Sequence, residues 1–307
     1  MSKRHEVIII GGGPAGLTAG LYTSRAGLNT LLIERGIFGG QIVNASQIDN
    51  YPGFPEGVSG FDLASLMEQQ ATKYGLETTT AEVTAIRPES THYIIITPEG
   101  NFEAKAVIIA AGSEYRKLGV SGEEKLTGRG VSYCATCDGF LFRDMDIAVI
   151  GGGDTAITDA LELSQHANKV YVIHRRDQLR AGHVLQQQAL THPKLKPVWD
   201  TVVDEIIGES KVNSLKLRNV KTDEATSLPV AGVFVAIGIE PRSQCFSSLV
   251  ELNETGHIKT DELMATSAPG VFAAGDIRKN SPRQVSSAVG DGATAALSAF
   301  KYLRERS

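Results

Sequence analysis

Two cysteines stand two residues apart in this chain, Cys134 and Cys137, and Asp138 follows them directly. Thiols at this spacing can close a small reversible disulfide that takes up two electrons. A neighbouring carboxyl group can move the proton that accompanies the electrons. The segment is therefore a candidate redox centre, with a metal site as the alternative, and the chain should also hold groups that deliver electrons to it.

Zinc is the metal that such a pair of cysteines would most readily bind, and a structural zinc site needs four ligands. Only one further cysteine is present, Cys245, and the nearest histidines are His166 and His174. Both histidines lie in the segment after the cysteines that is assigned below to a separate fold, so a zinc site is disfavoured. We expect no metal.

The composition restricts the class of protein further. The 307 residues suggest about two domains. The net charge of -5 argues against a nucleic-acid partner, and three cysteines are too few for a secreted disulfide framework. The apolar run near the N-terminus ends after four residues, and no stretch is long enough to span a membrane. We therefore expect a soluble, cytoplasmic protein.

A glycine-rich turn follows the first predicted strand. Residues 6–10 form an apolar run, glycines follow at Gly11, Gly13 and Gly16, and residues 17–26 have helical spacing. A second strand ends at Glu34, twenty-one residues beyond Gly13. This order is typical of a dinucleotide-binding fold, in which the glycines admit a pyrophosphate and the acid binds ribose hydroxyls.

The same pattern returns after the cysteines. Residues 146–150 predict a buried strand, Gly151 to Ala156 a second glycine turn, and residues 169–173 the next strand. Small antiparallel meanders are predicted within residues 81–111 and near residues 212–220, and short strands at 258–260 and 270–273. Helices are expected over 61–74 and 284–304. The fold class is thus α/β, with two Rossmann-like domains, each having a parallel sheet and a small antiparallel meander.

We expect the last predicted helix to complete the first domain, so that the second is inserted in the first. We place the first, discontinuous domain at residues 1–116 and 244–307. The inserted domain, which carries the cysteine pair, is placed at residues 117–243.

The two folds differ at the end of their second strands. The first has Glu34, which suits a free ribose 2'-hydroxyl, whereas the second has His174, Arg175 and Arg176, with Arg180 one helical turn beyond. Guanidinium groups suit a 2'-phosphate, so the second fold should prefer NADP over NAD. A flavin commonly transfers electrons between a nicotinamide and a disulfide, which assigns FAD to the first fold.

Further residues support the flavin assignment. Asp276 follows a predicted strand, where a carboxylate can bind the ribityl hydroxyls of FAD. The helix that begins near Arg283, Gln284 and Val285 would direct its positive end toward the flavin.

Seven motifs occur in one order along the chain: GGGPAG, NYPGF, CATCDG, GGGDTA, HRRDQLRA, PGVFAAGD and RQVSSAVGDGATAA. With this order and spacing, from about Val7 to Leu303, the chain resembles the low-molecular-weight, bacterial-type thioredoxin reductases. The resemblance implies a homodimer that oxidises NADPH and reduces the disulfide of thioredoxin or a thioredoxin-like protein through FAD. It also implies that the inserted domain rotates, so that the cysteines and the NADPH face the flavin in turn.

The resemblance also implies site residues. Cys134 and Cys137 would be the redox pair and Asp138 the acid-base group. The expected FAD contacts are Gly11, Gly13, Pro14, Ala15, Gly16, Glu34, Arg35, Gln41, Asn50, Val83, Ala111, Gly275, Asp276, Arg283, Gln284 and Val285. The expected NADPH contacts are Gly151, Gly153, Asp154, Thr155, His174, Arg175, Arg176 and Arg180.

The alternative function is an FAD-dependent dithiol oxidase, or a disulfide reductase that uses another electron donor. Such relatives tend to lose the basic cluster that this chain keeps. Ser113 and Arg242 depart from common residues of the family near the two predicted domain connections. These departures leave the rotation rate open.

Overall fold

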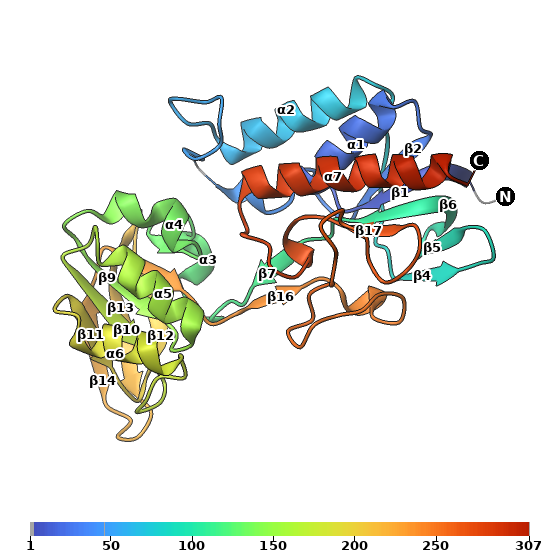
Figure 1. Ribbon diagram of the computed structural model, residues 1–307. Helices are drawn as coiled ribbons and strands as arrows, with labels where there is room; N and C mark the ends of the chain where they lie inside the picture. Colours follow the sequence, from blue (N-terminus) through green and yellow to red (C-terminus); the bar gives the residue numbers. More distant parts are fainter. Residues whose placement is uncertain (1–2, 46, 307) are drawn as a thin grey trace. The chain divides into compact units, whose positions relative to one another are not determined.

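The computed structural model describes residues 3–45 and 47–306. The chain forms two compact units (Figure 1). The first unit comprises residues 1–114 and 240–307, and the second unit comprises residues 115–239. The second unit is therefore one continuous segment that separates the two parts of the first.

The first unit is built on a seven-stranded sheet of order β3-β2-β1-β6-β5-β4, in which β17 also pairs with β6. Strands β4 and β5 are antiparallel to their neighbours, and the other pairings are parallel. The strands are β1 (Lys3–Ile10), β2 (Thr30–Glu34), β3 (Glu77–Thr80), β4 (Ala85–Pro88), β5 (Tyr93–Thr97), β6 (Gly100–Ile109) and β17 (Val271–Ala273).

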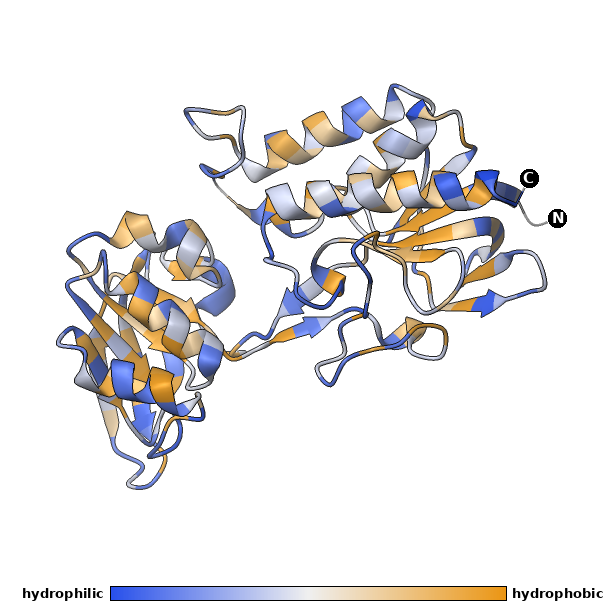
Figure 2. Ribbon diagram, in the orientation of Figure 1, coloured by the Kyte–Doolittle hydropathy of each residue, from blue (hydrophilic) through white to orange (hydrophobic). Residues whose placement is uncertain are grey.

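Helices cover one face of this sheet, where α1 packs against both α2 and α7 (Figure 1). Strand β1 is buried on both faces: Ile9 belongs to the core beneath α1 and α7, and Ile8 belongs to the core on the other face. Figure 2 shows the resulting apolar strands. The helices are α1 (Pro14–Arg25), α2 (Gly60–Thr72) and α7 (Val285–Arg304), and the 3-10 helices are η1 (Gly40–Asn44), η3 (Gln244–Phe246) and η4 (Gly275–Ile277).

The second unit has a five-stranded parallel sheet of order β11-β10-β9-β15-β8 and a three-stranded antiparallel sheet of order β12-β13-β14. The strands are β8 (Val131–Ser132), β9 (Asp146–Ile150), β10 (Lys169–Ile173), β11 (Leu195–Val198), β12 (Thr201–Gly208), β13 (Val212–Asn219), β14 (Ala225–Pro229) and β15 (Gly232–Val235). The helices are α3 (Glu123–Leu126), α4 (Ala135–Asp138), η2 (Gly139–Phe142), α5 (Asp154–Leu163) and α6 (His183–Thr191).

The chain passes between the units in two short strands that pair with each other, β7 (Ser113–Tyr115) and β16 (Ile239–Pro241). The predicted α/β class, with parallel sheets and additional antiparallel strands, is confirmed. The strand predicted at 258–260 is wrong, since Ile258 forms only isolated bridges with Leu252 and Arg278. Among the described residues, no helix is both long enough and apolar enough to cross a membrane.

Candidate active site

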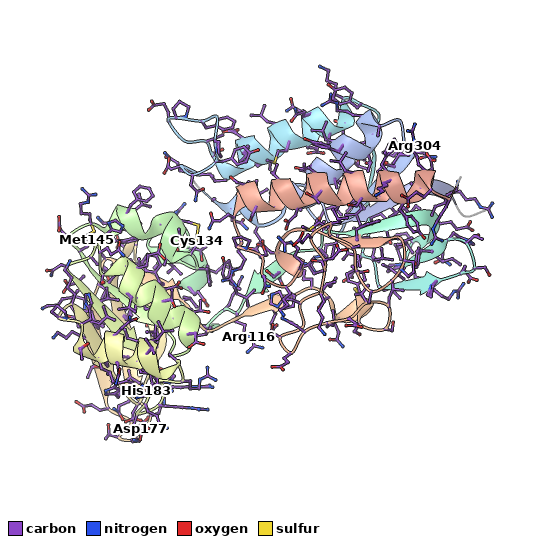
Figure 3. The ribbon with its side chains drawn as sticks, viewed as in Figure 1. Arg116, Cys134, Met145, Asp177, His183 and Arg304 are labelled. Atoms are coloured by element: carbon purple, nitrogen blue, oxygen red, sulfur yellow. A yellow bond between two sulfur atoms is a disulfide. The ribbon has the colours of Figure 1, made fainter. Side chains whose placement is uncertain are left out.

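Cys134 and Cys137 are joined by a disulfide with an S–S distance of 2.09 Å and a Cα–Cα distance of 5.3 Å. Cys134 is the N-terminal cap of the short helix α4, and Figure 3 labels it there. Its Sγ accepts a hydrogen bond of 3.2 Å from the backbone N–H of Cys137. An N–H directed at this sulfur would stabilise a thiolate on Cys134 once the disulfide opens.

Asp138 lies half-buried at the end of the same helix. The hydroxyl of Ser132 donates a hydrogen bond of 2.5 Å to Asp138 Oδ2, and its oxygen accepts the N–H of Cys134 at 3.1 Å. Burial raises the pKa of Asp138, while the bond from Ser132 lowers it in part. A carboxyl group of raised pKa, next to Cys137 in the chain, can supply the proton that disulfide opening requires.

A buried carboxylate fixes the chain just ahead of the cysteines. Glu123 accepts hydrogen bonds from the N–H groups of Leu118 and Gly119 and from the hydroxyl of Tyr133 at 2.9 Å. The ring of Tyr133 also stacks on Tyr115, with centroids 5.3 Å apart. No motif in the sequence predicts this arrangement, which anchors the residue adjacent to Cys134.

The first glycine turn joins β1 to α1 and meets the requirements of a dinucleotide. A Cβ atom on Gly13 would find no heavy atom within 4 Å, whereas one on Gly16 would overlap the carbonyl oxygen of Gly11. The turn is therefore open where a pyrophosphate would approach the N-terminus of α1 and tightly packed where helix meets strand.

Glu34 ends β2 beside this turn. Its Oε2 accepts the N–H of Gly12 at 2.6 Å, and its Oε1 accepts the N–H of Gly36 at 2.9 Å. These bonds hold the carboxylate in place, and its remaining lone pairs suit ribose hydroxyls. The chemistry of this donor and acceptor set fits the ribose of FAD.

Asp276 lies in η4, directly after β17. Ser281 donates a hydrogen bond of 2.9 Å to its carboxylate, while burial raises its pKa. Two predicted FAD contacts from distant parts of the sequence also meet here, since the side-chain amide of Asn50 donates to Gln284 Oε1 at 3.1 Å. Gln284 is the N-terminal cap of α7, so these residues converge on the start of that helix.

Other predicted FAD contacts have partners within the protein. The side-chain amide of Gln41 donates to the carbonyl oxygen of Ser113 at 2.6 Å. Arg35 and Arg242 both form ion pairs with Glu114 on β7. Two further predicted contacts, Val83 and Ala111, are partly buried. They pack against the core on the face of the first sheet opposite α1.

The second glycine turn joins β9 to α5 and is likewise open at its third glycine, because a Cβ atom on Gly153 would meet nothing within 4 Å. The backbone N–H groups of Arg180 and Ala181 donate to Gly152 O at 2.6 and 3.1 Å, and Asp154 accepts the N–H of Gly182 at 2.7 Å. Residues 180–182 are thereby held beside the turn. This geometry suits a second dinucleotide.

His174 directly follows β10, and its ring is packed against Gly152, where a Cβ atom would overlap the imidazole. The side chain is buried, and its Nε2 is one of three buried side-chain polar atoms in the described residues without a hydrogen-bond partner. Burial lowers the pKa of His174, and the charges of Arg180, Arg176 and Arg175 lower it further. The imidazole is therefore neutral at physiological pH.

Three guanidinium groups lie close enough to the His174 imidazole for their charges to lower its pKa. The arginine cluster, Arg175, Arg176 and Arg180, is exposed and forms no ion pair within residues 3–45 and 47–306. The nearby acid Asp177 is instead paired with Lys221 at 3.0 Å. In the view of Figure 3, Asp177 and Cys134 lie toward opposite ends of the second unit. The free charges of the cluster suit a dianionic phosphate.

Fold and site together define a flavin- and nicotinamide-linked disulfide enzyme, and comparison with known proteins agrees. Residues 5–292 match the model of the family described as pyridine nucleotide-disulphide oxidoreductase, to which the chain belongs. Within that class it belongs to the thioredoxin reductases, a family of NADPH-dependent FAD flavoproteins. The chain is thus an enzyme whose cofactors are FAD and NADPH.

Three relatives illustrate the similarity. The thioredoxin reductase of Listeria innocua is 46% identical over 99% of this chain and 95% of its own length. The structure of the enzyme from Streptococcus pyogenes is 44% identical, covers 99% of this chain and 100% of its own, and has a TM-score of 0.96. The Lactococcus lactis enzyme, solved in an FR conformation, is also 44% identical over 98% and 99% of the two chains, with a TM-score of 0.66.

Proposed function

We propose that this enzyme reduces the disulfide of thioredoxin, or of a thioredoxin-like protein, with electrons from NADPH that pass through Cys134 and Cys137. The observation that carries the proposal is the Cys134–Cys137 disulfide beside a carboxyl group of raised pKa, in the same unit as the arginine cluster. When bound, FAD supplies the two-electron transfer between the nicotinamide and this disulfide.

The residues of the chain supply the remaining chemistry. Two electrons and two protons open the Cys134–Cys137 disulfide to two thiols, and Asp138 delivers one of the protons. One of these thiols loses its proton, and its thiolate attacks the disulfide of the partner protein. The partner's S–S bond breaks, one partner sulfur leaves and takes up a proton, and the other partner sulfur is held in a mixed disulfide. The second thiol of the pair displaces the partner as a dithiol and closes the internal disulfide again, which restores the starting enzyme.

The cofactor assignments to the two domains belong to this proposal. Residues 1–116 and 244–307 would bind FAD, through the open turn at Gly13 and the carboxylates of Glu34 and Asp276. Residues 117–243 would bind NADPH, through the turn at Gly153 and the arginine cluster. Because the cysteines and the cluster belong to one unit and must both serve a single flavin, we propose that this domain rotates between the two half-reactions. We further propose a cytoplasmic homodimer.

The decisive experiment compares NADPH consumption with oxidised thioredoxin and with oxygen alone. We expect rapid consumption only with thioredoxin, and we expect Cys137→Ser to abolish it while NADPH still bleaches the flavin. Cys245→Ser is the matched control, since Cys245 lies outside the disulfide. Equal NADPH consumption with oxygen alone would mean that the flavin passes its electrons to oxygen and would refute the proposal. A dithiol oxidase would instead take its electrons from a dithiol and would consume no NADPH in either assay.

A further inference from the structure

One carboxylate on α7 holds both ends of the turn that carries Asp276. Asp291 Oδ2 accepts the backbone N–H of Gly275 at 3.1 Å, at the start of η4. Arg278, just after the end of η4, donates from Nε to Oδ2 at 2.5 Å and from Nη2 to Oδ1 at 2.7 Å. Asp276 lies between these two attachments.

This pair is largely buried and geometrically specific. The side chain of Asp291 is 8% exposed and that of Arg278 is 16% exposed. Two parallel N–H···O bonds fix the guanidinium relative to the carboxylate in distance and in plane. Because a buried pair often contributes little net stability, its value to the fold alone is a weak reason for it to be present.

Backbone hydrogen bonds restrain η4 together with the Asp291 side chain. Gly275 has a φ of +75°, and the turn closes through a hydrogen bond of 3.2 Å from the N–H of Arg278 to Gly275 O. Ahead of the turn, Ala274 is held by the sheet, since its N–H donates to Ile109 O at 3.0 Å. At the far end, Ile258 donates its N–H to Ile277 O at 2.9 Å and accepts the N–H of Lys279 at 2.8 Å. Asp291 adds a side-chain restraint at both ends of a turn whose flanks are held by these backbone bonds.

We propose that Asp291 and Arg278 form a positioning clamp that presents the Asp276 carboxylate to the ribityl hydroxyls of FAD and thereby determines FAD affinity. The inference rests on the proposed FAD site of the first unit. Asp291 and Arg278 do not touch the cofactor in this proposal and act through Gly275 and Asp276. The charges of the pair also oppose each other at Asp276, because Asp291 raises the pKa of that carboxyl group and Arg278 lowers it.

The test is titration of the apoprotein with FAD, followed by flavin fluorescence, together with the melting temperature of each apoprotein. Asp291→Asn keeps an acceptor for the Gly275 N–H but loses the ion pair, and we expect its dissociation constant for FAD to rise at least tenfold. Arg278→Lys keeps the charge but not both bonds, and we expect a smaller rise. Glu251→Gln removes the exposed pair with Lys259 in the same unit and should change neither quantity.

The double variant Asp291→Leu/Arg278→Met separates positioning from stability, since an apolar replacement of a buried pair often restores stability. We expect its melting temperature to recover while its FAD affinity stays low; recovery of both would overturn the clamp. If Asp291→Asn fails to fold, Arg278→Lys decides, and parental FAD affinity in that variant overturns the proposal.

Asp276→Asn serves as the reference for the FAD site itself. If it weakens FAD binding while Asp291→Asn and Arg278→Lys bind as the parent does, only the clamp is refuted. If Asp276→Asn binds FAD as tightly as the parent, the proposed FAD site is wrong, and the clamp is refuted with it.

Discussion

Asp138 is bound to Ser132 by a hydrogen bond of 2.5 Å, and through the same hydroxyl it is connected to the backbone of Cys134. The carboxyl group is thus fixed relative to the first sulfur of the disulfide by one side chain. Burial raises its pKa, and the Ser132 hydroxyl offsets part of that rise.

Replacing Ser132 by Ala should move the pH dependence of thioredoxin reduction. The change removes a bond that stabilises the carboxylate, so the pKa of Asp138 rises further and its proton remains available to higher pH. We expect the alkaline fall in rate to shift to higher pH, and Asp138→Asn to slow the thiol step by roughly 10²- to 10⁴-fold. Ser132→Thr keeps a hydroxyl and should retain the parental profile. An unshifted profile in Ser132→Ala would contradict the assignment.

The same pKa has a consequence for stability. Because the pKa of Asp138 is higher in the folded than in the unfolded state, its contribution is fully present below the unfolded value of about 4 and is lost as pH rises through the folded value. As the pH rises from the unfolded to the folded pKa of Asp138, the Asp138→Asn variant should therefore lose less stability than the parent. Denaturant unfolding over that pH range measures the difference, and parallel curves would count against a raised pKa.

The two cysteines should differ in acidity once separated. The Cys137 N–H directed at Cys134 Sγ favours a thiolate at Cys134, and a hydrogen bond to a charged group contributes about 1.5–3 kcal/mol. We expect the thiol of Cys134 in a Cys137→Ser apoprotein to have a pKa about one unit or more below that of Cys137 in Cys134→Ser. Alkylation rates as a function of pH measure both values. A lower pKa for Cys137 would reverse the assignment.

Loss of the arginine cluster should change nucleotide preference. Replacing Arg176 or Arg180 by Ala removes charged hydrogen bonds to the proposed 2'-phosphate, and kcat/KM for NADPH should fall about 10- to 100-fold. The value for NADH should stay nearly constant, since that nucleotide lacks the phosphate. Arg218→Gln, which breaks an ion pair with Asp204 in the same unit, is the control. Equal losses for the two nucleotides would refute the role of the cluster.

Two glycines of the first turn should respond in opposite ways. Gly13→Ala places a methyl group in open space at a φ of -75°, so apoprotein stability should change by less than about 0.5 kcal/mol while FAD binding weakens. Gly16→Ala should destabilise the apoprotein by about 1–3 kcal/mol, because its methyl group overlaps the backbone of Gly11. Thermal unfolding and FAD titration distinguish the two. Parental FAD affinity in Gly13→Ala would exclude a pyrophosphate there.

Local patterns in the sequence predicted the features that depend on neighbouring residues. The glycine turns, the continuous strand 6–10 and the helix that begins near Gln284 all follow from short-range rules of backbone conformation and periodicity. Strand β3 was missed because its Glu-Thr-Thr-Thr segment is polar and acquires strand geometry from pairing with β2. Helix α6 was missed because its glutamine-rich sequence carries little amphipathic signal.

The sequence predicted which residues form the candidate site better than it predicted the contacts between them. Sequence position alone indicated that Arg175 and Arg176 follow the end of a strand. It did not indicate that Lys221 would form an ion pair with Asp177. The bond between Tyr133 and Glu123 joins residues ten apart, neither of which was a predicted site residue. Such pairs arise from tertiary packing, which leaves no periodic trace in the chain.

Glu34, held by the N–H groups of Gly12 and Gly36, places a carboxylate at the proposed FAD turn, whereas His174 and two arginines follow the corresponding strand β10 of the second unit. The first arrangement would repel a 2'-phosphorylated adenosine, and the second would attract it. On the proposed assignment, the two turns would therefore not exchange their nucleotides, despite their common backbone. An inhibitor built on adenosine 2',5'-bisphosphate would compete with the reductant and leave the flavin in place.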